Sequence, residues 1–348
     1  MSFDGIEVDM LNLGNADSIL VTKWVAGSAS RILIDGGNLS DSDRILAFLK
    51  SRGVTYLDHI VCTHPHDDHA GGLVGIVKSP EIDFGQAWIH LPWNHVNQEM
   101  LANVLNRSEA STKRVVNIIR ASVQTTRDLV GAIGARRKPI IEPFAGLKIG
   151  FLYVCGPSKS FYEQLLKDFT DFEKLKAMEN AITAYEAQDL VETLFGMTAY
   201  GKQAEAAEPG LGQAPTEPEN NSSTILWAKQ ANDAFLFTAD AGVEALTLAK
   251  QAYQLSSLCW MQIPHHGSRR NVNEDLIAYF KPQTAFVSAD GTNKHPRRKV
   301  VNAFKAVGTR VFSTHYPTPN GGNKWFSLGT VPLRPDYTVA VPLYEADK

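Results

Sequence analysis

Residues 63–72 read Thr63-His64-Pro65-His66-Asp67-Asp68-His69-Ala70-Gly71-Gly72, and no other segment of the chain is as informative. Three imidazoles and two carboxylates lie within six positions of it, directly after the strand-like run 57–62. Imidazole nitrogens and carboxylate oxygens are the ligands that Zn²⁺, Mn²⁺ or Fe²⁺ takes in an open, water-binding site. A loop leaving a strand can direct His64 and His66 to one side and Asp68 and His69 to the other. The segment therefore indicates two neighbouring metal ions.

A histidine-rich surface loop without metal is the alternative interpretation. The chain has only ten histidines among 348 residues, so three within six positions are not expected by chance.

The content of 44% apolar and 20% charged residues is ordinary for a globular protein. Although 348 residues is long for one core, α/β enzymes reach this length as one elaborated domain, which we expect over residues 1–348. The net charge of −3 argues against broad, non-specific nucleic-acid binding but not against a local basic groove.

The cysteines and the N-terminal segment bear on the compartment. Cys62, Cys155 and Cys259 are odd in number and widely spaced, which indicates reduced thiols and no disulfide framework. Residues 1–10 lack a basic start followed by an apolar core, so no signal peptide is expected. No apolar run approaches the length of a membrane span. We expect a cytoplasmic protein without membrane contact.

Apolar periodicity predicts an alternation of strands and helices. A helix capped by Ser40 or Asp41 is expected to end at Gly53, and two further helices at about 242–253 and 273–280. Helical spacing and composition also predict two insertions, at 94–138 and at 158–220, the second ending in a flexible loop at about 202–220. The expected strands cover residues 6–13, 18–22, 31–34, 57–62, 87–91, 146–154, 224–228, 234–238, 259–263 and 284–288.

The second half offers further metal ligands. Asp240 follows the strand 234–238, where on its own it is better explained as a helix N-cap than as a ligand. The next strand, however, ends in Pro264-His265-His266-Gly267-Ser268, which repeats the arrangement of the first loop. Together, the two loops supply enough ligands for two metal ions, if Asp240 bridges the ions and water fills a remaining position. The candidate ligands are His64, His66, Asp68, His69, Asp240 and one or both of His265 and His266.

These motifs, in this order, resemble the metallo-β-lactamase superfamily. Within it, the chain is similar to the hydrolase domain of ComEC-type DNA-uptake proteins and their free-standing relatives. The resemblance rests on His64-x-His66-x-Asp68-His69, Asp240, Gly14-Asn15-Ala16-Asp17-Ser18, Asp35-Gly36-Gly37, Asn220-Asn221-Ser222-Ser223, Pro264-His265-His266-Gly267-Ser268 and Asn293-Lys294-His295-Pro296. It implies an α/β fold, the four-layer αββα sandwich with helical insertions. It also implies a metal-dependent hydrolase, a phosphodiesterase or nuclease that uses a metal-bound hydroxide.

The chain departs from the family pattern at several points. Asn15 and Ala16 replace the usual Gln and Gly, and no Gly precedes His295. Many relatives also have a metal-binding His between the first motif and the bridging Asp. The candidates here are His90 and His95, and neither has a clear ligand context. The ion beside His64 and His66 is therefore expected to have fewer protein ligands.

The resemblance assigns roles around the metals. It implies catalytic roles for Asp68, Asp240 and His295, with His295 giving a proton to the leaving oxygen or binding phosphate, unless it only bonds the backbone. Asp35 would hold a ligating His through its second ring nitrogen. Asn221 and Ser268 would donate hydrogen bonds to substrate, or cap a helix or turn. The basic run 297–299 would flank the pocket or form an ordinary solvated surface.

The expected substrate is a phosphodiester in single-stranded nucleic acid or a nucleotide-derived small molecule, and the expected cofactors are two divalent ions, Zn²⁺ or Mn²⁺. Two alternatives remain open. The same chemistry would hydrolyse a carbonyl ester, thioester or lactone, and the chain could instead be a non-catalytic, metal-bearing module of a larger assembly. The helical insertions are where a protein partner is expected to bind.

Overall fold

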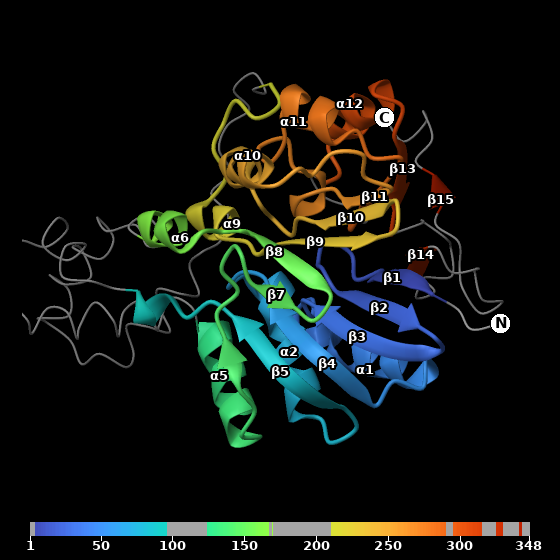
Figure 1. Ribbon diagram of the computed structural model, residues 1–348. Coiled ribbons are helices and arrows are strands. Elements are labelled where there is room, and N and C mark those ends of the chain that lie inside the picture. The colour runs from blue at the N-terminus through green and yellow to red at the C-terminus, as the bar shows by residue number, and fades with distance from the viewer. Residues whose placement is uncertain are drawn as a thin grey trace, which may run out of the picture.

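Two β-sheets packed face to face form the framework, and helices cover both outer faces (Figure 1). The protein is seen in a computed structural model that describes residues 4–95, 124–166, 169, 210–289, 295–314, 325–329 and 341–342. The four-layer α/β/β/α arrangement predicted from the sequence is confirmed. In the described part of the chain, no helix combines the length and the apolarity needed to cross a membrane.

The first sheet comes mainly from the N-terminal part of the chain. Its described strands are ordered β14-β1-β2-β3-β4-β5-β6. Strands β1 to β3 pair antiparallel, whereas β3, β4, β5 and β6 pair parallel. The bounds are β1 Gly5–Leu11, β2 Ile19–Val25, β3 Ser28–Ile34, β4 Tyr56–Cys62, β5 Asp83–Ile89, β6 Ile140–Ile141 and β14 Trp325–Gly329. The outer face is covered by α1 Ser42–Ser51, α2 Asp67–Lys78 and α5 Gln124–Ala135, with η1 Leu39–Asp41 and η2 Pro92–Asn94 in the connections.

The second sheet comes mainly from the C-terminal half. Its described strands are ordered β15-β13-β12-β11-β10-β9-β8-β7, and β10 to β13 pair parallel. The bounds are β7 Lys148–Ile149, β8 Leu152–Gly156, β9 Ile225–Gln230, β10 Asp233–Phe237, β11 Trp260–Gln262, β12 Thr284–Val287, β13 Arg310–Ser313 and β15 Val341–Pro342. The helical elements of this half are α6 Lys159–Leu165, α9 Pro218–Asn221, α10 Val243–Ala252, η3 His265–Gly267, α11 Glu274–Phe280 and α12 Arg298–Ala306.

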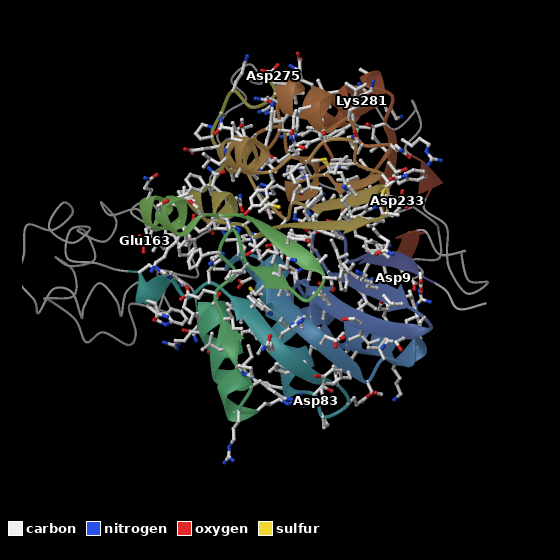
Figure 2. The ribbon with its side chains drawn as sticks, viewed as in Figure 1. Asp9, Asp83, Glu163, Asp233, Asp275 and Lys281 are labelled. Atoms are coloured by element: carbon white, nitrogen blue, oxygen red, sulfur yellow. The ribbon has the colours of Figure 1, made fainter. Side chains whose placement is uncertain are left out.

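The alternation of side chains along the strands explains the four layers. On β2, Ile19 and Val21 are buried between the two sheets, whereas Leu20 packs under the helices of the first sheet. On β10, Phe235 and Phe237 likewise enter the space between the sheets, which side chains fill in Figure 2. Because successive side chains of a strand point to opposite faces, each inner sheet has two apolar faces to cover. One face meets the other sheet and the other meets helices.

Helix α2 begins inside the histidine motif, where the sequence analysis expects a loop. Its N-terminal half packs against the turn after β3, and Gly71 and Gly72 allow the close approach. A Cβ atom at Gly72 would overlap the carbonyl oxygen of Gly36, and a Cβ atom at Gly71 would lie 2.5 Å from the Leu39 nitrogen. This contact fixes the start of the helix beside Asp35.

Alanine at position 72 is therefore expected to destabilise the protein strongly. Because backbone atoms occupy the space, the substitution forces α2 away from the Gly36 turn, at a cost of about 3 kcal/mol or more. Gly131→Ala on α5, where no atom lies within 4 Å of the added Cβ, is the control, and it should be neutral or stabilise by roughly 0.5–1 kcal/mol. Urea unfolding of both variants measures the difference. Equal stabilities would contradict the close contact.

The expected insertions are only partly described. Residues 96–123, 167–168 and 170–209 lie outside the described part, so the helical insertions over 94–138 and 158–220, and a single domain over 1–348, stay predictions. Where it is described, α5 packs Leu129 and Ile133 into the core beneath the first sheet. Residues 210–220, the end of the expected flexible loop, form turns and most of α9, with Leu211 and Asn220 buried. The strands β6, β13, β14 and β15 and the helix α12 were not predicted.

Candidate metal centre

Loops from both halves of the chain bring six candidate ligands together. His64, His66 and His69 follow β4, whereas Asp240 follows β10 and His265 and His266 follow β11. These are the ends of strands in the parallel parts of the two sheets. Side chains at such ends converge because the loops leave the sheets at one edge.

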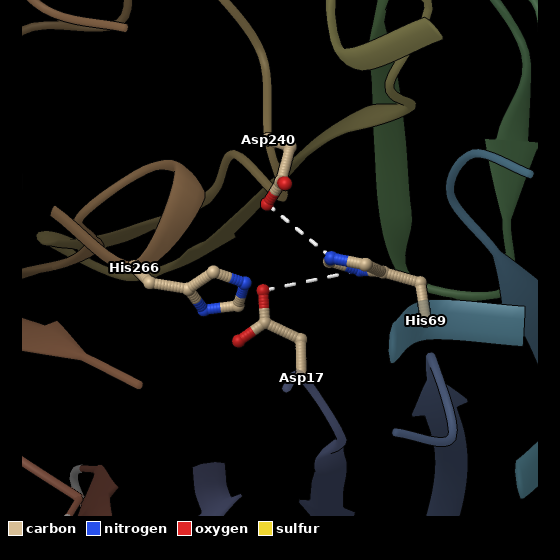
Figure 3. A group of neighbouring side chains, drawn as sticks. All are labelled: Asp17, His69, Asp240 and His266. Carbon is tan, nitrogen blue, oxygen red and sulfur yellow. Dashed lines mark ion pairs between the residues drawn. The ribbon is translucent and has the colours of Figure 1, made fainter. Parts of the chain in front are cut away.

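One group of possible ligand atoms consists of Asp17, His69, Asp240 and His266 (Figure 3). Their donor atoms all lie within 4.8 Å of one another, and all four side chains are buried. Nε2 of His69 lies 3.3 Å from Oδ1 of Asp240, and Nδ1 of His69 lies 3.9 Å from Oδ2 of Asp17. Two imidazoles and two carboxylates form a set that suits a divalent transition metal ion.

A second group consists of His64, His66 and Asp240, again with donor atoms within 4.8 Å of one another. His64 Nε2 lies 3.8 Å from Asp240 Oδ2. His64 and Asp240 are buried, whereas the side chain of His66 is 31% exposed. Asp240 thus belongs to both groups, which is the position of a bridging ligand.

Buried polar atoms that lack hydrogen-bond partners test whether these residues fit metal ions. Among the described residues, Nε2 of His64, Nε2 of His69 and Oδ1 of Asp240 are buried and have no hydrogen-bond partner. Burying polar atoms without partners costs free energy, and each such atom calls for an explanation. Since all three belong to the two ligand groups, bound cations would satisfy all of them. The residues fit a metal centre.

The electrostatics of the centre agree with this assignment. Although burial opposes the charged ring, the carboxylates of Asp240, Asp35 and Asp68 raise the pKa of His69 well above its usual range. Burial likewise opposes charge on His266, yet its hydrogen bond to Asp68 and the nearby Asp17 raise its pKa to about 9. Without a metal, protons therefore neutralise the crowded carboxylates. A divalent cation would displace these protons on binding.

Neighbouring groups fix the orientation of the ligating rings. Nδ1 of His69 lies 2.8 Å from Asp35 Oδ2, and Asp35 also accepts hydrogen bonds from the backbone N–H (2.8 Å) and hydroxyl (2.7 Å) of Thr63. Nδ1 of His266 lies 2.8 Å from the Ser288 carbonyl oxygen. Such contacts fix ring orientation at metal sites, and here they leave Nε2 of His69 near Asp240 and Nε2 of His266 near Asp68. Asp35 therefore contacts a candidate ligand, and its predicted role of holding a metal-bound ring stays a prediction.

The chain is similar to known proteins. Residues 11–134 match the family model described as Metallo-beta-lactamase superfamily. This part of the chain is similar to metallo-β-lactamase domains, in agreement with the two-sheet fold. The chain is 21% identical over 326 residues to ComE operon protein 3 of Bacillus subtilis (strain 168), a match that covers 88% of this chain and 32% of that protein. It therefore spans about a third of the length of this relative. A crystal structure described as hydrolase AbOPH in beta lactamase superfamily aligns with a TM-score of 0.35 and 11% identity, covering 93% of this chain and 94% of that one.

The two adjacent histidines after β11 have different surroundings. His265 and His266 both adopt positive φ angles, 48° and 53°, which are strained for residues other than glycine. His266 joins the four-residue group, whereas His265 belongs to neither group. His265 Nε2 nevertheless lies 3.7 Å from Asp240 Oδ2, while its Nδ1 lies 3.2 Å from Asn271 Oδ1. The strained turn therefore directs both rings at the centre.

Asp68 lies at the edge of the candidate centre. Its Oδ2 lies 3.3 Å from His266 Nε2 and 3.9 Å from His69 Nε2, and its side chain is 31% exposed. It is absent from both compact groups, and Asp17 takes a place in the four-residue group instead. The predicted ligand role of Asp68 stays a prediction.

Asp17 is the member of the centre that the sequence analysis did not assign. Burial raises its pKa to about 6. Its Oδ2 accepts a hydrogen bond from Gln262 Nε2 (2.9 Å) and its Oδ1 accepts one from the Ser288 hydroxyl. Its signal in the sequence is the turn at residues 14–18, which forms part of the family resemblance.

Three further expected site residues make other contacts. Asn221 Oδ1 accepts a hydrogen bond from the backbone N–H of Gly242 (3.1 Å), at the N-terminus of α10. Ser268 Oγ accepts one from the N–H of Arg270 (3.3 Å), as in a turn. His295 is half-buried with its ring 5.6 Å from that of His265, and burial lowers its pKa to about 3. A neutral His295 can donate an N–H to an anion but carries no charge at neutral pH.

His90 and His95, the two candidates for a middle ligand, lie in a separate aromatic cluster. Burial lowers the pKa of His90 to about 3, and its ring stacks on Tyr162 with centroids 4.5 Å apart. The Nε2 atom of His95 lies 2.7 Å from Glu142 Oε2, and its Nδ1 lies 3.1 Å from Glu163 Oε1. Neither histidine belongs to a ligand group of the described residues.

His95 predicts a pH-dependent contribution to stability. Although burial opposes the charged ring, hydrogen bonds to Glu142 and Glu163 raise the pKa of His95 above 6.5. A group whose pKa is higher in the folded state than in the unfolded state stabilises the fold. This stabilisation is fully present when the pH is below the unfolded-state pKa, and it is lost as the pH rises through the folded-state pKa. His95→Gln should therefore cost about 1–2 kcal/mol near pH 6 and clearly less near pH 9, measured by urea unfolding. An equal cost at both pH values would contradict the charged pair.

Proposed function

We propose that the chain hydrolyses phosphodiesters with the help of two divalent ions. The observation that carries the proposal is the pair of ligand groups that share Asp240 and contain the buried, unpaired nitrogens of His64 and His69. Zn²⁺ and Mn²⁺ both accept this mixture of imidazole and carboxylate ligands. When bound, the ions would lower the pKa of a water nucleophile and stabilise negative charge on the phosphoryl oxygens.

The chain's own residues hold the site in a fixed geometry. Asp35 and the Ser288 carbonyl set the rings of His69 and His266 before any substrate arrives. Asp240 is held through its backbone, because its carbonyl accepts a hydrogen bond from Asn271 Nδ2 (2.7 Å). Such preorganisation means that little reorganisation is needed during the reaction.

The N-terminus of α12 favours an anionic substrate. The backbone N–H of Arg297, its N-cap, donates to the carbonyl of Gly267 (3.1 Å), which places this helix end beside the turn at 265–267. A helix N-terminus carries partial positive charge, and Arg298 and Lys299 add two exposed cationic side chains in its first turn. A phosphodiester would gain from this field more than a neutral ester or lactone.

Within the proposed site, His295 donates an N–H to a phosphoryl or leaving oxygen, because its Nδ1 is buried without a partner among the described residues. Since the chain has a net charge of −3, the positive field is local. The proposed substrate is therefore a single strand of nucleic acid or a small nucleotide-derived phosphodiester rather than a long duplex.

Two chromogenic substrates test the proposed function. The metal-free protein is reconstituted with Mn²⁺ or Zn²⁺ and assayed with bis(para-nitrophenyl) phosphate and with para-nitrophenyl acetate. The expected result is metal-dependent turnover of the phosphodiester only. Metal-dependent turnover of the acetate only would overturn the proposal in favour of a carbonyl hydrolase. Bound metal without turnover of either substrate, or of a short single-stranded DNA, would indicate a non-catalytic module.

A further inference from the structure

The two ligand groups are unequal, and the weaker one borders the segment that leads into α9. The group with His69 contains four buried donors, whereas the group with His64 contains three, of which His66 is partly exposed. Near His66 lies Glu217, whose Oε2 is 3.8 Å from His66 Nε2. We propose that Glu217 is the fourth protein ligand of the ion held by His64, His66 and Asp240. The inference rests on the proposed two-ion centre.

The distances favour a shared cation over a direct ion pair. A contact of 3.8 Å is too long for a hydrogen bond between His66 and Glu217. Two atoms that each lie about 2.0–2.2 Å from one ion are separated by roughly 3–4.4 Å. The 3.8 Å between His64 Nε2 and Asp240 Oδ2 falls in the same range. Both pairs thus have the spacing of ligands around a metal ion.

An independent observation points to a missing ligand partner at this position. His64 is fully buried, and its Nε2 has no hydrogen-bond partner among the described residues. Its Nδ1 lies 3.2 Å from the Thr63 hydroxyl, so the ring is held with Nε2 toward Asp240. The unpaired nitrogen marks where a cation belongs. Glu217 lies next to His66, the third member of that group, and its carboxylate would turn toward His64 and Asp240 on binding the ion.

The backbone of Glu217 is held in place by contacts to the centre. Glu217 is the N-cap of α9, and its carbonyl accepts a hydrogen bond from the N–H of Asn221 (3.1 Å). At the other end of α9, Asn220 Nδ2 lies 3.2 Å from His265 Nδ1, and the N–H of Thr224 donates to the carbonyl of Thr63 (3.0 Å). The carboxylate itself is 68% exposed, so it can rotate toward an ion without disturbing the core.

A neighbouring carboxylate provides a matched control. Glu219 also has an oxygen within 4.8 Å of the donor atoms of His66 and Glu217. It lies inside α9, whereas Glu217 precedes the helix and is the one paired with His66 at 3.8 Å.

Two imidazoles and two carboxylates give the ion an oxygen-rich set of ligands. Such a set accommodates Mn²⁺ better than an imidazole-rich one, so Glu217→His is expected to shift the preference toward Zn²⁺.

Metal binding by the full chain tests the inference directly. Untagged, metal-free protein is titrated with Mn²⁺ alone by calorimetry, and bound metal is counted by mass spectrometry after gel filtration. The wild type is expected to bind two ions. Glu217→Gln should keep one ion at wild-type affinity and weaken the other by at least about 10-fold, a loss typical even for residues that only support a ligand. Glu219→Gln should bind both ions as the wild type does.

Each other outcome would overturn the inference in a recognisable way. Two ions bound with unchanged affinity by Glu217→Gln would exclude a ligand role for Glu217. A third ion in the wild type that alone disappears in Glu217→Gln would indicate a separate surface site. If metal affinity weakens in Glu219→Gln and not in Glu217→Gln, the ligand is Glu219 and the inference is wrong. A wild type that binds no ion would overturn the two-ion centre together with the inference, so the two failures are distinguishable.

Discussion

Asparagine at position 240 is expected to remove both bound ions and to abolish hydrolysis. Asp240 is the residue common to the two ligand groups, and its carboxylate lies 3.3 Å from His69 and 3.8 Å from His64. Asparagine keeps the volume of the side chain but removes the charge that neutralises the cations. The variant is expected to lose about 4 kcal/mol of transition-state stabilisation. This loss lowers kcat/KM for a phosphodiester roughly 10³-fold, which a kinetic assay measures.

The control for this variant is Asp275→Asn, which removes a carboxylate from the exposed first turn of α11 (Figure 2). It should bind metal and turn over substrate as the wild type does. Circular dichroism shows whether Asp240→Asn stays folded. A folded Asp240→Asn protein that retains two ions and most of its activity would contradict the bridging position.

Chelation is expected to lower the thermal stability of the wild-type protein by about 5–10 °C, which corresponds to two ions present at roughly 100 times their Kd. Removing the ions leaves the buried carboxylates of Asp17, Asp35 and Asp240 to be neutralised by protons on His69 and His266 alone. Scanning calorimetry with and without chelator measures the shift. In Asp240→Asn the same chelator should change the midpoint by less than about 2 °C. An equal shift in both proteins would mean that the ions bind elsewhere.

The sequence sufficed to predict which segments meet at the candidate centre. His64, His66 and His69 follow one strand, and Asp240 and His266 follow strands of the second half. In parallel sheets, strand ends of this kind meet at one edge, so their convergence follows from the order of elements. The two-sheet framework was predicted from the family resemblance of the motifs, whereas the apolar periodicity alone predicted only the alternation of strands and helices.

Other parts depend on contacts that no local pattern reveals. Helix α2 contains Gly71 and Gly72, which disfavour a helix, and the contact with Gly36 explains them. Asp17 has the local signature of a turn residue. Its place in the centre depends on Gln262 and Ser288, which lie 245 and 271 residues away in the chain. Long-range contacts of this kind appear only once the sheets are assembled.

Glu217 illustrates the same limit within the candidate site. Its segment is rich in Ala, Glu, Pro and Gly, a composition that predicts a loop and gives no reason to choose one carboxylate. The contact of Asn220 with His265 brings this segment to the centre and sets Glu217 beside His66. The choice between His265 and His266 also required the tertiary structure, because both rings follow the same strand.

The central claim is that residues from both halves of the chain hold two metal ions around Asp240. Anomalous diffraction from crystals soaked in Mn²⁺ or Zn²⁺, recorded on both sides of the metal absorption edge, tests it most directly. We predict two anomalous peaks flanking Asp240, one beside His64 and His66 and the other beside His69 and His266. The absence of both peaks, or peaks only at residues away from Asp240, would contradict the account.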